Sequence, residues 1–500
     1  MAEEIEKVRH SHGNSLDEDI VTGKVSNSGI ILRPQPTNDP NEPLNWPQRE
    51  KYATYLVLCW FTFLSFTNSS AFTVAVKSIV AEFDKTTTEA SYLTSLQVLA
   101  MGFGAAFWMP IARKVGKRPV YLVSILFLCV TNIWSYFAKS YGNLLASRVV
   151  GGFLTAASDA PVSSVAADLF YFHERGHTLM IFNIAISSGA FLGPFINAYI
   201  TQYLGWPWMC GIMAIASGAT FILAIPLVKE TSYIVPDRVR DLDRSAETYA
   251  PKTSWAASMS LTAGMDRDAS FFRWVFETVQ LFSYPPIWYS GLTVGLFIGC
   301  NIALQLTASQ TFTASPYDWQ LHDVGLFSLS GFTGSLLSFF FGGWLIDWIA
   351  TTRRHGEHVE PEYRLPAMII PAVIGPMGLL TFGLVIATGK SWAGAAIGYG
   401  MQGFGATAAA NIAVTYVVDA YRPVAGETIV IVFVLRNVIV CLISTYISKW
   451  FESQGLKNAY GELVAVAYII LSFTLVMYFV GHRLRRFTRS YGPMARLTER

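Results

Sequence analysis

The sequence predicts an all-α polytopic membrane protein with twelve transmembrane helices in two six-helix halves. Three observations support this fold class. The 500 residues are 52% hydrophobic and only 14% charged, a balance outside the usual range of water-soluble globular chains. Long apolar runs recur along almost the whole chain, and a segment of the first half returns in the second half.

The apolar runs predict the individual helices. Each run is long enough to cross about 30 Å of hydrocarbon as a helix of roughly 20 residues. The predicted spans are 53–76, 91–111, 119–138, 142–166, 178–202, 207–228, 287–310, 325–350, 367–387, 392–418, 427–450 and 461–482.

The polar segments between and outside these runs divide the chain into regions. None of them is long enough to predict a second folded domain. The predicted regions are an N-terminal tail (1–50), a first six-helix half (51–228), a central loop (229–285), a second six-helix half (286–482) and a C-terminal tail (483–500).

Two of the polar regions carry further signals. The N-terminal tail has no apolar core behind a basic start, which predicts a cytosolic tail without a cleavable signal peptide. In the central loop, residues 269–282 (ASFFRWVFETVQLF) have apolar side chains at helical spacing. This pattern fits a helix lying along the membrane interface and, equally, a short helix packed on the protein.

Basic residues in the short loops predict the orientation, because Lys and Arg gather on the cytoplasmic side of membrane proteins. With both termini in the cytosol, the cytoplasmic loops and tail receive Arg113, Lys114, Lys117, Arg118, Arg175, Arg353, Arg354, Arg364, Arg422, Arg483, Arg485, Arg486 and Arg489. The opposite loops hold only the single lysines Lys85, Lys139, Lys390 and Lys457.

The internal repeat appears when the second half is moved back by 251 positions. Residues 151–170 then lie over residues 402–421, and the helix at 142–166 corresponds to the helix at 392–418. The matched pairs are Gly152 with Gly403, Phe153 with Phe404, Ala157 with Ala408, and Asp168 with Asp419. Two parallel six-helix repeats with a binding site between them suit transport by alternating access.

Charged side chains inside the spans are the main candidates for transport chemistry, because a charge in hydrocarbon is costly. Asp159 is the first candidate for carrying a proton, since an acid in a low-dielectric cavity favours its protonated form. Glu427 is the second candidate. The alternative for Asp159 is a structural bond to a neighbouring helix. Arg436 either binds an anionic group or neutralises an acid.

Neutral polar side chains inside the spans complete the candidate substrate cavity. For each Asn or Gln, a hydrogen bond between helices is the competing explanation. The predicted cavity residues are Asn68, Gln97, Asn183, Asn301, Gln305, Gln402, Asn411 and Arg436.

The stretch MPIARKVGKRPV (109–120) places four cations within six positions, which first indicates a cytoplasmic anchor. It also resembles a loop motif, G-x-L-x-D-R-x-G-R-R, of the major facilitator superfamily. The chain resembles this superfamily over residues 45–485, and within it the fungal drug:proton antiporter-like transporters. The matching positions in both halves are Gly116, Lys117, Arg118, Gly343 and Asp347; the departures are Met109 for glycine and Arg113 for the acid.

Further motifs carry the same resemblance. RVVGG resembles the family's fourth-helix motif through Arg148 and Gly152, and GAFLGPFINA resembles the antiporter motif through Gly189, Gly193 and Pro194. NEPLNWP (41–47) is similar to the segment before the first helix of fungal members. TYVVDAYRPVAGE (415–427) is similar to a subgroup that includes histidinol and polyamine transporters.

The resemblance implies a major facilitator fold and a gate at the loop motif. In the family, the loop acid and basic residues form a latch that closes the cytoplasmic side. Because Arg113 reverses the charge of that acid, we expect a carboxylate partner among Asp168, Glu174 and Glu427 when this side is closed.

Other sequence features exclude several classes of function. The five cysteines fall in predicted spans without metal-site or disulfide spacing, and the net charge of +2 gives no argument for nucleic acid. GLVIATGKS (383–391) ends in Gly-Lys-Ser, but its first glycine is displaced by one position from a phosphate loop. The sequence therefore predicts no metal, cofactor, nucleotide or nucleic-acid partner, and the resemblance implies a proton gradient as the energy source.

Three functions fit these observations. The resemblance favours a proton-coupled antiporter that exports small organic molecules such as drugs, toxins or secondary metabolites. The alternative is a proton symporter that imports a cationic small molecule or nutrient, such as a polyamine or amino-acid derivative. A polytopic membrane enzyme would need clustered catalytic groups, which the eight histidines do not form. The expected partners are a small-molecule substrate, protons and lipid, with a monomer in the plasma membrane or, alternatively, the vacuolar membrane.

Overall fold

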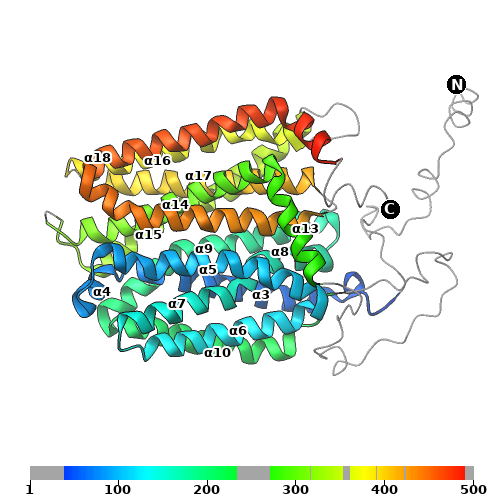
Figure 1. Ribbon diagram of the computed structural model, residues 1–500, viewed down its shortest axis with the longest axis horizontal. Helices are drawn as coiled ribbons and strands as arrows, with labels where there is room; N and C mark the ends of the chain where they lie inside the picture. The colour runs from blue at the N-terminus through cyan, green and yellow to red at the C-terminus, as the bar shows by residue number, and fades with distance from the viewer. Residues whose placement is uncertain are drawn as a thin grey trace, which may run out of the picture.

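The computed structural model describes residues 39–232, 271–315, 317–352, 361–389, 391–421 and 424–489. In these ranges the regular secondary structure is helical, and no strand occurs. Figure 1 shows long helices lying alongside one another, with the short helix α4 near one end and α13 near the other. We call these the α4 end and the α13 end.

The helices that precede the central loop form the first bundle. After a short 3₁₀ turn, η1 (Pro43–Asn45), they are α3 (Gln48–Ser70), η2 (Ala71–Thr73), α4 (Val76–Phe83), α5 (Thr87–Val115), α6 (Lys117–Tyr136), α7 (Tyr141–Thr155), η3 (Ala156–Ser158), α8 (Ala160–Leu169), α9 (Phe172–Leu204) and α10 (Trp206–Leu227).

The helices that follow the central loop form the second bundle. They are α14 (Pro285–Phe312), α15 (Leu321–Thr352), η5 (Pro361–Met368), α16 (Ile369–Ala387), α17 (Trp392–Ala420) and α18 (Ala425–Arg489), preceded by α13 (Phe271–Gln280) and η4 (Leu281–Ser283). α18 consists of two arms joined at Gly455, whose φ of 76° is a backbone conformation that favours glycine.

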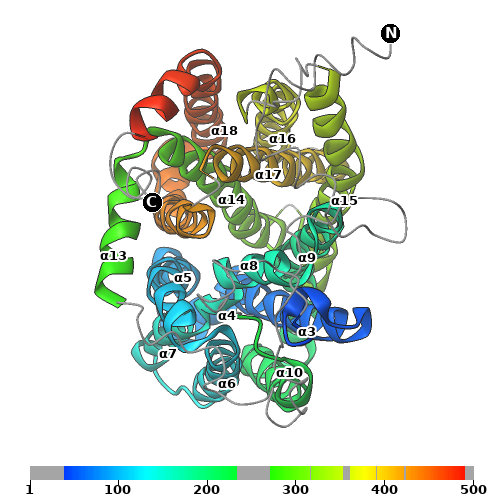
Figure 2. The same cartoon turned by 90° about the vertical axis from the view of Figure 1, so that its right-hand side faces the viewer.

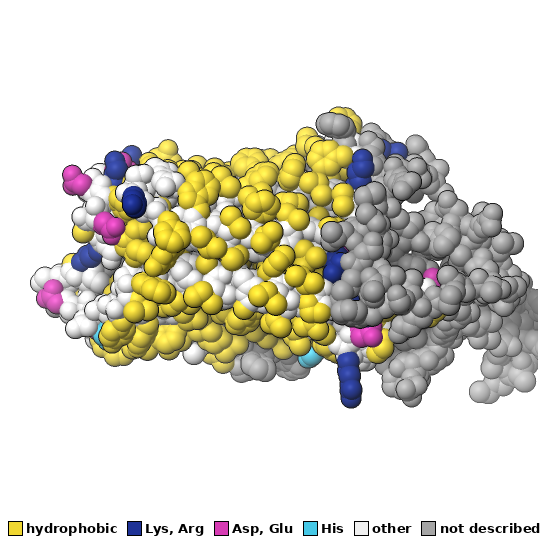
Figure 3. All heavy atoms as spheres, turned by 90° about the horizontal axis from the view of Figure 1, so that it is seen from below, with side chains coloured by type: hydrophobic (Ala, Val, Ile, Leu, Met, Phe, Trp, Pro, Cys, Tyr) yellow, Lys and Arg dark blue, Asp and Glu magenta, His cyan; other side chains and the backbone are white. Residues whose placement is uncertain are grey.

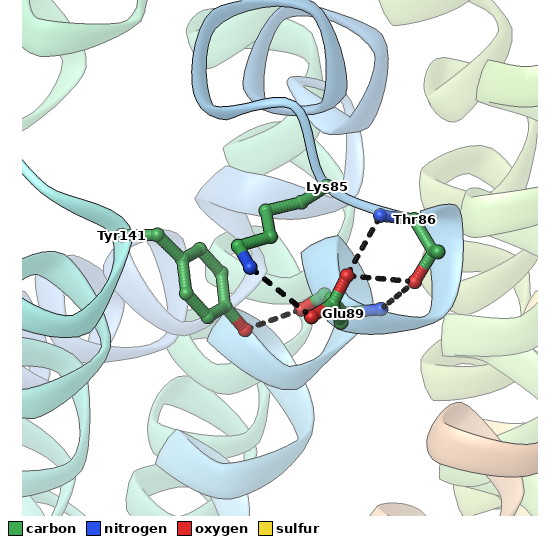
Figure 4. A network of polar contacts seen from close by, with 4 residues as sticks. All are labelled: Lys85, Thr86, Glu89 and Tyr141. Atoms are coloured by element: carbon green, nitrogen blue, oxygen red, sulfur yellow. Dashed lines mark hydrogen bonds and ion pairs between the residues drawn. The ribbon is translucent and has the colours of Figure 1, made fainter.

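Local signals explain where α5 begins and ends. Thr86 and Glu89 form a capping box at its start, and Tyr141 at the start of α7 donates to the Glu89 carbonyl at 2.7 Å (Figure 4). Lys85 pairs with Glu89 in the same network. At the other end, Gly116 takes a φ of 109° between α5 and α6, a conformation that favours glycine.

The two bundles meet along two seams. In the first bundle α3 packs on α9 and α10, and α5 packs on α7; in the second, α14 packs on α18 and α17, and α15 packs on α17. Between the bundles, α5 packs against α18 and α9 against α15. Figure 2 shows this arrangement from the α13 end, with α6, α7 and α10 on one side and α16, α17 and α18 on the other.

The helices are suited to a membrane. Among the described residues, eight helical segments are long and apolar enough to cross one. Figure 3 shows a continuous hydrophobic surface between two ends where charged side chains gather. The twelve predicted spans fall almost wholly within helical residues. The eight segments do not include α15, α17 or the interrupted helix formed by α7 and α8, and they count the two arms of α18 as one segment. The number twelve therefore stays a prediction.

Candidate functional site

Asp159 lies where the helix formed by α7 and α8 is broken. Its backbone (φ −99°, ψ −98°) is not helical and separates η3 from α8. The neighbouring Ser158 is held by α3, because its carbonyl accepts from Thr62 at 2.9 Å and its hydroxyl lies 2.8 Å from Ser65 Oγ. The sequence placed Asp159 inside a continuous span and did not predict this break.

Asp159 forms an ion pair with Arg436 across the seam between the bundles. Nη2 of Arg436 in α18 donates to Oδ2 of Asp159, and the two side chains are 4% and 0% exposed. Arg436 is also held by its own helix: Nε donates to Asn437 Oδ1 at 3.0 Å, and the guanidinium lies 4.3 Å from the centre of the Phe433 ring. The two charged candidates of the sequence therefore neutralise each other, while Asp159 Oδ1 and Asn437 Nδ2 have no hydrogen-bond partner within the described part of the chain.

Arg148 is a second buried arginine, and it lies within the first bundle. Its Nη1 donates to Asn68 Oδ1 at 2.9 Å, and its Nη2 donates to the Asn68 carbonyl at 2.5 Å and to Gln97 Oε1. The Phe72 ring packs against the guanidinium at 4.6 Å. No acid of the described residues pairs with Arg148. Asn68 and Gln97, predicted as cavity residues, thus accept hydrogen bonds from this arginine.

Gln305 and Asn301 form a polar contact nearer the α4 end. Gln305 Nε2 donates to Asn301 Oδ1 at 2.7 Å and to the Ala190 carbonyl of α9 at 3.0 Å. Thr73 of η2 lies 3.2 Å from Gln305 Oε1. Because Ala190 and Thr73 belong to the first bundle and Gln305 to the second, this contact also crosses between the bundles.

The other predicted cavity residues are not part of one cluster. Gln402 is buried and donates to the Phe297 carbonyl at 2.9 Å, so it joins α17 to α14 within the second bundle. Asn183 in α9 and Asn411 in α17 are half-buried, and neither makes a side-chain hydrogen bond to another described residue. These two amides keep free hydrogen-bonding capacity.

The α4 end of the molecule is joined between the bundles by hydrogen bonds. Ser309 Oγ of α14 donates to the Val74 carbonyl at 3.1 Å, and Lys77 of α4 donates to the Thr313 carbonyl at 2.7 Å. On the α9–α15 seam, the Leu321 amide donates to Gln202 Oε1 at 3.2 Å. Hydrogen bonds from α14 and from α15 therefore join the bundles at this end.

Arg113, the predicted gate residue, contacts the second bundle at the α13 end. Its Nη1 lies 2.7 Å from Glu427 Oε1, so Glu427 is the partner among the three expected carboxylates. A Cβ atom at Gly426 would lie 2.9 Å from Arg113 Nη2, which shows how closely the guanidinium approaches α18. The Trp274 ring of α13 covers the guanidinium at 4.3 Å. Glu427, the second proton candidate, is thus the partner of the predicted gate residue.

Lys117 and Arg118 of the loop motif bind within the first bundle. Lys117 pairs with Asp168 at the end of α8. Glu230 accepts from the amides of Lys117 and Arg118, at 3.0 Å each, and so caps α6; Arg118 Nε donates to the Val228 carbonyl at 2.7 Å. In the second bundle Arg364 pairs with Asp419 at 2.9 Å, so the two aspartates matched by the repeat both bind a cation.

The remaining motif positions lie in α9 and α15. A Cβ atom at Gly193 would lie 2.4 Å from Ser70 Oγ and 3.0 Å from Thr67 Cα, so this glycine permits close packing of α9 on α3. Pro194 follows inside α9. Gly343 and Asp347 belong to α15, but their side chains lie outside the described residues.

Several residues of the site were not predicted from the sequence. Phe72 and Trp274 each cover an arginine, and Glu230 caps α6. Trp274 lies in the amphipathic stretch 269–282, and this helical pattern is the sequence signal that could have indicated an aromatic residue near Arg113. The positions of Phe72 and Glu230 depend on tertiary packing.

Comparison with known proteins identifies the family. The model of the Major Facilitator Superfamily matches residues 58–444. The chain belongs to the major facilitator superfamily. It is therefore an integral membrane protein of a transporter family, and not an enzyme.

Relatives and solved structures agree with this assignment. The chain is 24% identical to Protein HOL1 of Saccharomyces cerevisiae, over 94% of this chain and 92% of that protein. It is 26% identical to the major facilitator superfamily multidrug transporter mdrA of Aspergillus fumigatus, over 90% and 74%. The xylose transporter XylE from E. coli, in a partially occluded inward-open conformation, has the same fold, with a TM-score of 0.59, 14% identity and coverage of 85% and 98%.

Proposed function

We propose that this protein is a proton-coupled secondary active transporter that exports small organic molecules by alternating access. The two bundles act as the two six-helix halves, 51–228 and 286–482, with twelve spans in total. The α13 end and both termini face the cytosol, and the plasma membrane is the expected location. The equivalent helix packing within the two bundles supports this arrangement.

The observation that carries the proposal is the Asp159–Arg436 pair. It is buried and joins the two bundles, so their rocking apart separates the two charges. An unpaired charge in a low-dielectric interior is unfavourable, and a proton on Asp159 removes one of the two. Protonation of Asp159 therefore favours separation, which is the link that a proton-driven cycle needs.

The contacts at the two ends support alternating access. The hydrogen bonds at the α4 end join α14 and α15 to the first bundle, whereas Arg113 and Glu427 join the bundles at the α13 end on the α5–α18 seam. A cycle in which these contacts break in turn exposes the region between the bundles to one side and then the other. The half-buried amides of Asn183 and Asn411 are candidate substrate contacts.

Import of a cationic molecule is the second candidate, and the same pair favours it. Asp159 is an acid inside the protein whose bound partner is a guanidinium. An ammonium group of a substrate can replace Arg436 there, while an exporter of neutral compounds needs no such exchange. The two candidates differ in whether substrate and proton move in the same direction.

The test begins with the substrate and then measures coupling. The protein is expressed in a host that lacks its own related transporters, and compounds are screened both for changed toxicity and for growth as nutrients. Uptake of a compound that gives either response in the screen is then measured in vesicles with an imposed pH gradient. We expect transport without ATP and its loss with a protonophore; transport that continues after the gradient is abolished rejects proton coupling.

Asp159→Asn tests the residue assignment. We expect this variant to reach the membrane and exchange substrate, but to lose uphill transport driven by a pH gradient. Glu362→Gln is the matched control, because Glu362 is also a buried acid bound to an arginine, Arg485, at 3.1 Å, but both belong to the second bundle. Uphill transport by Asp159→Asn at the unmodified rate assigns Asp159 a structural role.

A further inference from the structure

Helix α13 has two faces with different surroundings. Trp274 and Thr278 face the protein, where α13 packs against both α5 and α18. Phe276 and Val279 are 56% and 54% exposed, one turn apart on the opposite face. Arg273, exposed one turn earlier, pairs through Nε with Glu277 Oε1 at 3.0 Å. Two large apolar side chains on one exposed helix face call for a partner.

The position of this face identifies lipid as that partner. α13 packs on α5, whose Phe107 ring lies 6.3 Å from the Phe271 ring of α13. Phe107 and Phe103 are themselves 40% and 52% exposed and belong to the apolar surface of a membrane-spanning helix. α13 therefore lies against the lipid-facing surface of α5 near the α13 end of the molecule, and its outer face, with Phe276 and Val279, is turned away from the protein. This position corresponds to the depth at which amphipathic helices bind a bilayer.

The inner face of the same helix holds the gate. Trp274 covers the Arg113 guanidinium, which also pairs with Glu427 and lies close to Gly426 of α18. Arg113 belongs to the first bundle, its acid to the second, and the tryptophan to the segment that connects them. A cation between an aromatic ring and a carboxylate is held by both, so the ring limits the positions that Arg113 can adopt.

We propose that α13 is a membrane-docked clamp on the gate. Phe276 and Val279 insert into the boundary between headgroups and acyl chains, and Trp274 positions Arg113 against Glu427. Lipid at this surface thereby favours the state in which α5 and α18 are joined at the α13 end. This role is independent of the substrate and of the direction of transport.

The first test locates the outer face of α13. The full-length protein, with its five native cysteines replaced, carries a single fluorophore-labelled cysteine at Phe276 or Val279 and is reconstituted in phosphatidylcholine vesicles. Matched labels at Ile215, 68% exposed on α10, and at exposed Lys139 between α6 and α7 give the lipid and water references. We expect nitroxide-bearing lipid to quench the α13 labels more strongly than aqueous iodide, as at Ile215.

Two outcomes of this test overturn the docking. Stronger quenching by iodide, as at Lys139, places the face in water. Quenching by neither reagent places it against protein, such as a second copy of this chain.

The second test measures the positioning by Trp274. The thermal unfolding midpoint is compared for the parent protein, Trp274→Ala, Trp274→Phe, Arg113→Gln and the double variant Trp274→Ala with Arg113→Gln. We expect the alanine variant to lower the midpoint in the parent, the phenylalanine variant to restore most of it, and the alanine change to have no further effect once Arg113 is replaced. If Trp274→Ala lowers the midpoint equally with Arg113 present and with Arg113 replaced, Trp274 contributes only packing, and the proposed clamp is rejected.

Discussion

The two buried arginines of this protein differ in what neutralises them and in what they join. Arg436 binds the carboxylate of Asp159 on the other bundle, whereas Arg148 binds the amide oxygens of Asn68 and Gln97 in its own bundle. In the proposed rocking motion, a bond within one bundle persists, but a bond between the bundles must break. The difference indicates that Arg148 stabilises the first bundle, whereas the pairing of Arg436 depends on the relative position of the two bundles.

The strongest way to break this comparison is to remove the acid. Asp159→Leu leaves Arg436 buried and unpaired, and we expect the free energy of unfolding to fall by about 3 to 5 kcal/mol. The double variant Asp159→Leu with Arg436→Met removes both charges and should recover most of this loss. Unfolding of the purified protein in detergent measures both, and a double variant no more stable than Asp159→Leu contradicts the ion-pair explanation.

The corresponding change in the first bundle should be smaller. Arg148→Met leaves the oxygens of Asn68 and Gln97 unpaired, but it also removes a buried charge that has no acid beside it. We expect a loss of about 1 to 3 kcal/mol, the usual cost of unsatisfied buried groups. The same unfolding measurement applies, and a loss as large as that of Asp159→Leu would show that the two sites are not different in kind.

Gln97→Glu sharpens the comparison by making the first site resemble the second. The new carboxylate has nearly the same shape as the amide and lies against Arg148, so its hydrogen bond becomes charge-assisted. We expect a gain of about 1 kcal/mol, the difference between neutral and charged hydrogen bonds. Gln402 forms no hydrogen bond with a buried arginine of the described residues, so Gln402→Glu is the matched control and should be destabilising. A lower free energy of unfolding in both variants contradicts a charge-assisted bond to Arg148.

The smallest effect is expected at the gate. Arg113 is 31% exposed, so its pair with Glu427 is screened by water and salt, and Arg113→Gln should cost about 0 to 1 kcal/mol. The difference between parent and variant should shrink further as salt is raised, because ions screen exposed charges. Unfolding at low and high salt measures this, and a difference that does not change with salt would place Arg113 with the buried arginines.

The sequence predicted the helices better than their interruptions. Apolar runs of sufficient length are a local signal, and each predicted span lies almost wholly in helical residues. The break at Asp159 was missed, because it depends on Thr62 and Ser65 of α3 holding Ser158, a contact between distant segments. The capping of α5 by Thr86 and Glu89, by contrast, is written in neighbouring residues.

For the candidate site, the sequence supplied the residues but not their partners. Asp159, Arg436 and Arg148 stood out because charges are rare in apolar runs. That Asp159 binds Arg436 while Arg148 binds amides follows from the packing of α7, α8 and α18, which no local pattern encodes. For Arg113, the expectation of an acid partner followed from charge alone, and Glu427 occupies that place.

The hydrogen bonds that join the bundles at the α4 end have a consequence for evolution. Their acceptors include the main-chain carbonyls of Val74, Ala190 and Thr313, which every residue type provides. Mutations at these three positions can change the side chain without removing the acceptor. Sequence changes at these three positions therefore preserve the acceptors, whereas the donors Ser309, Gln305 and Lys77 depend on their own side chains.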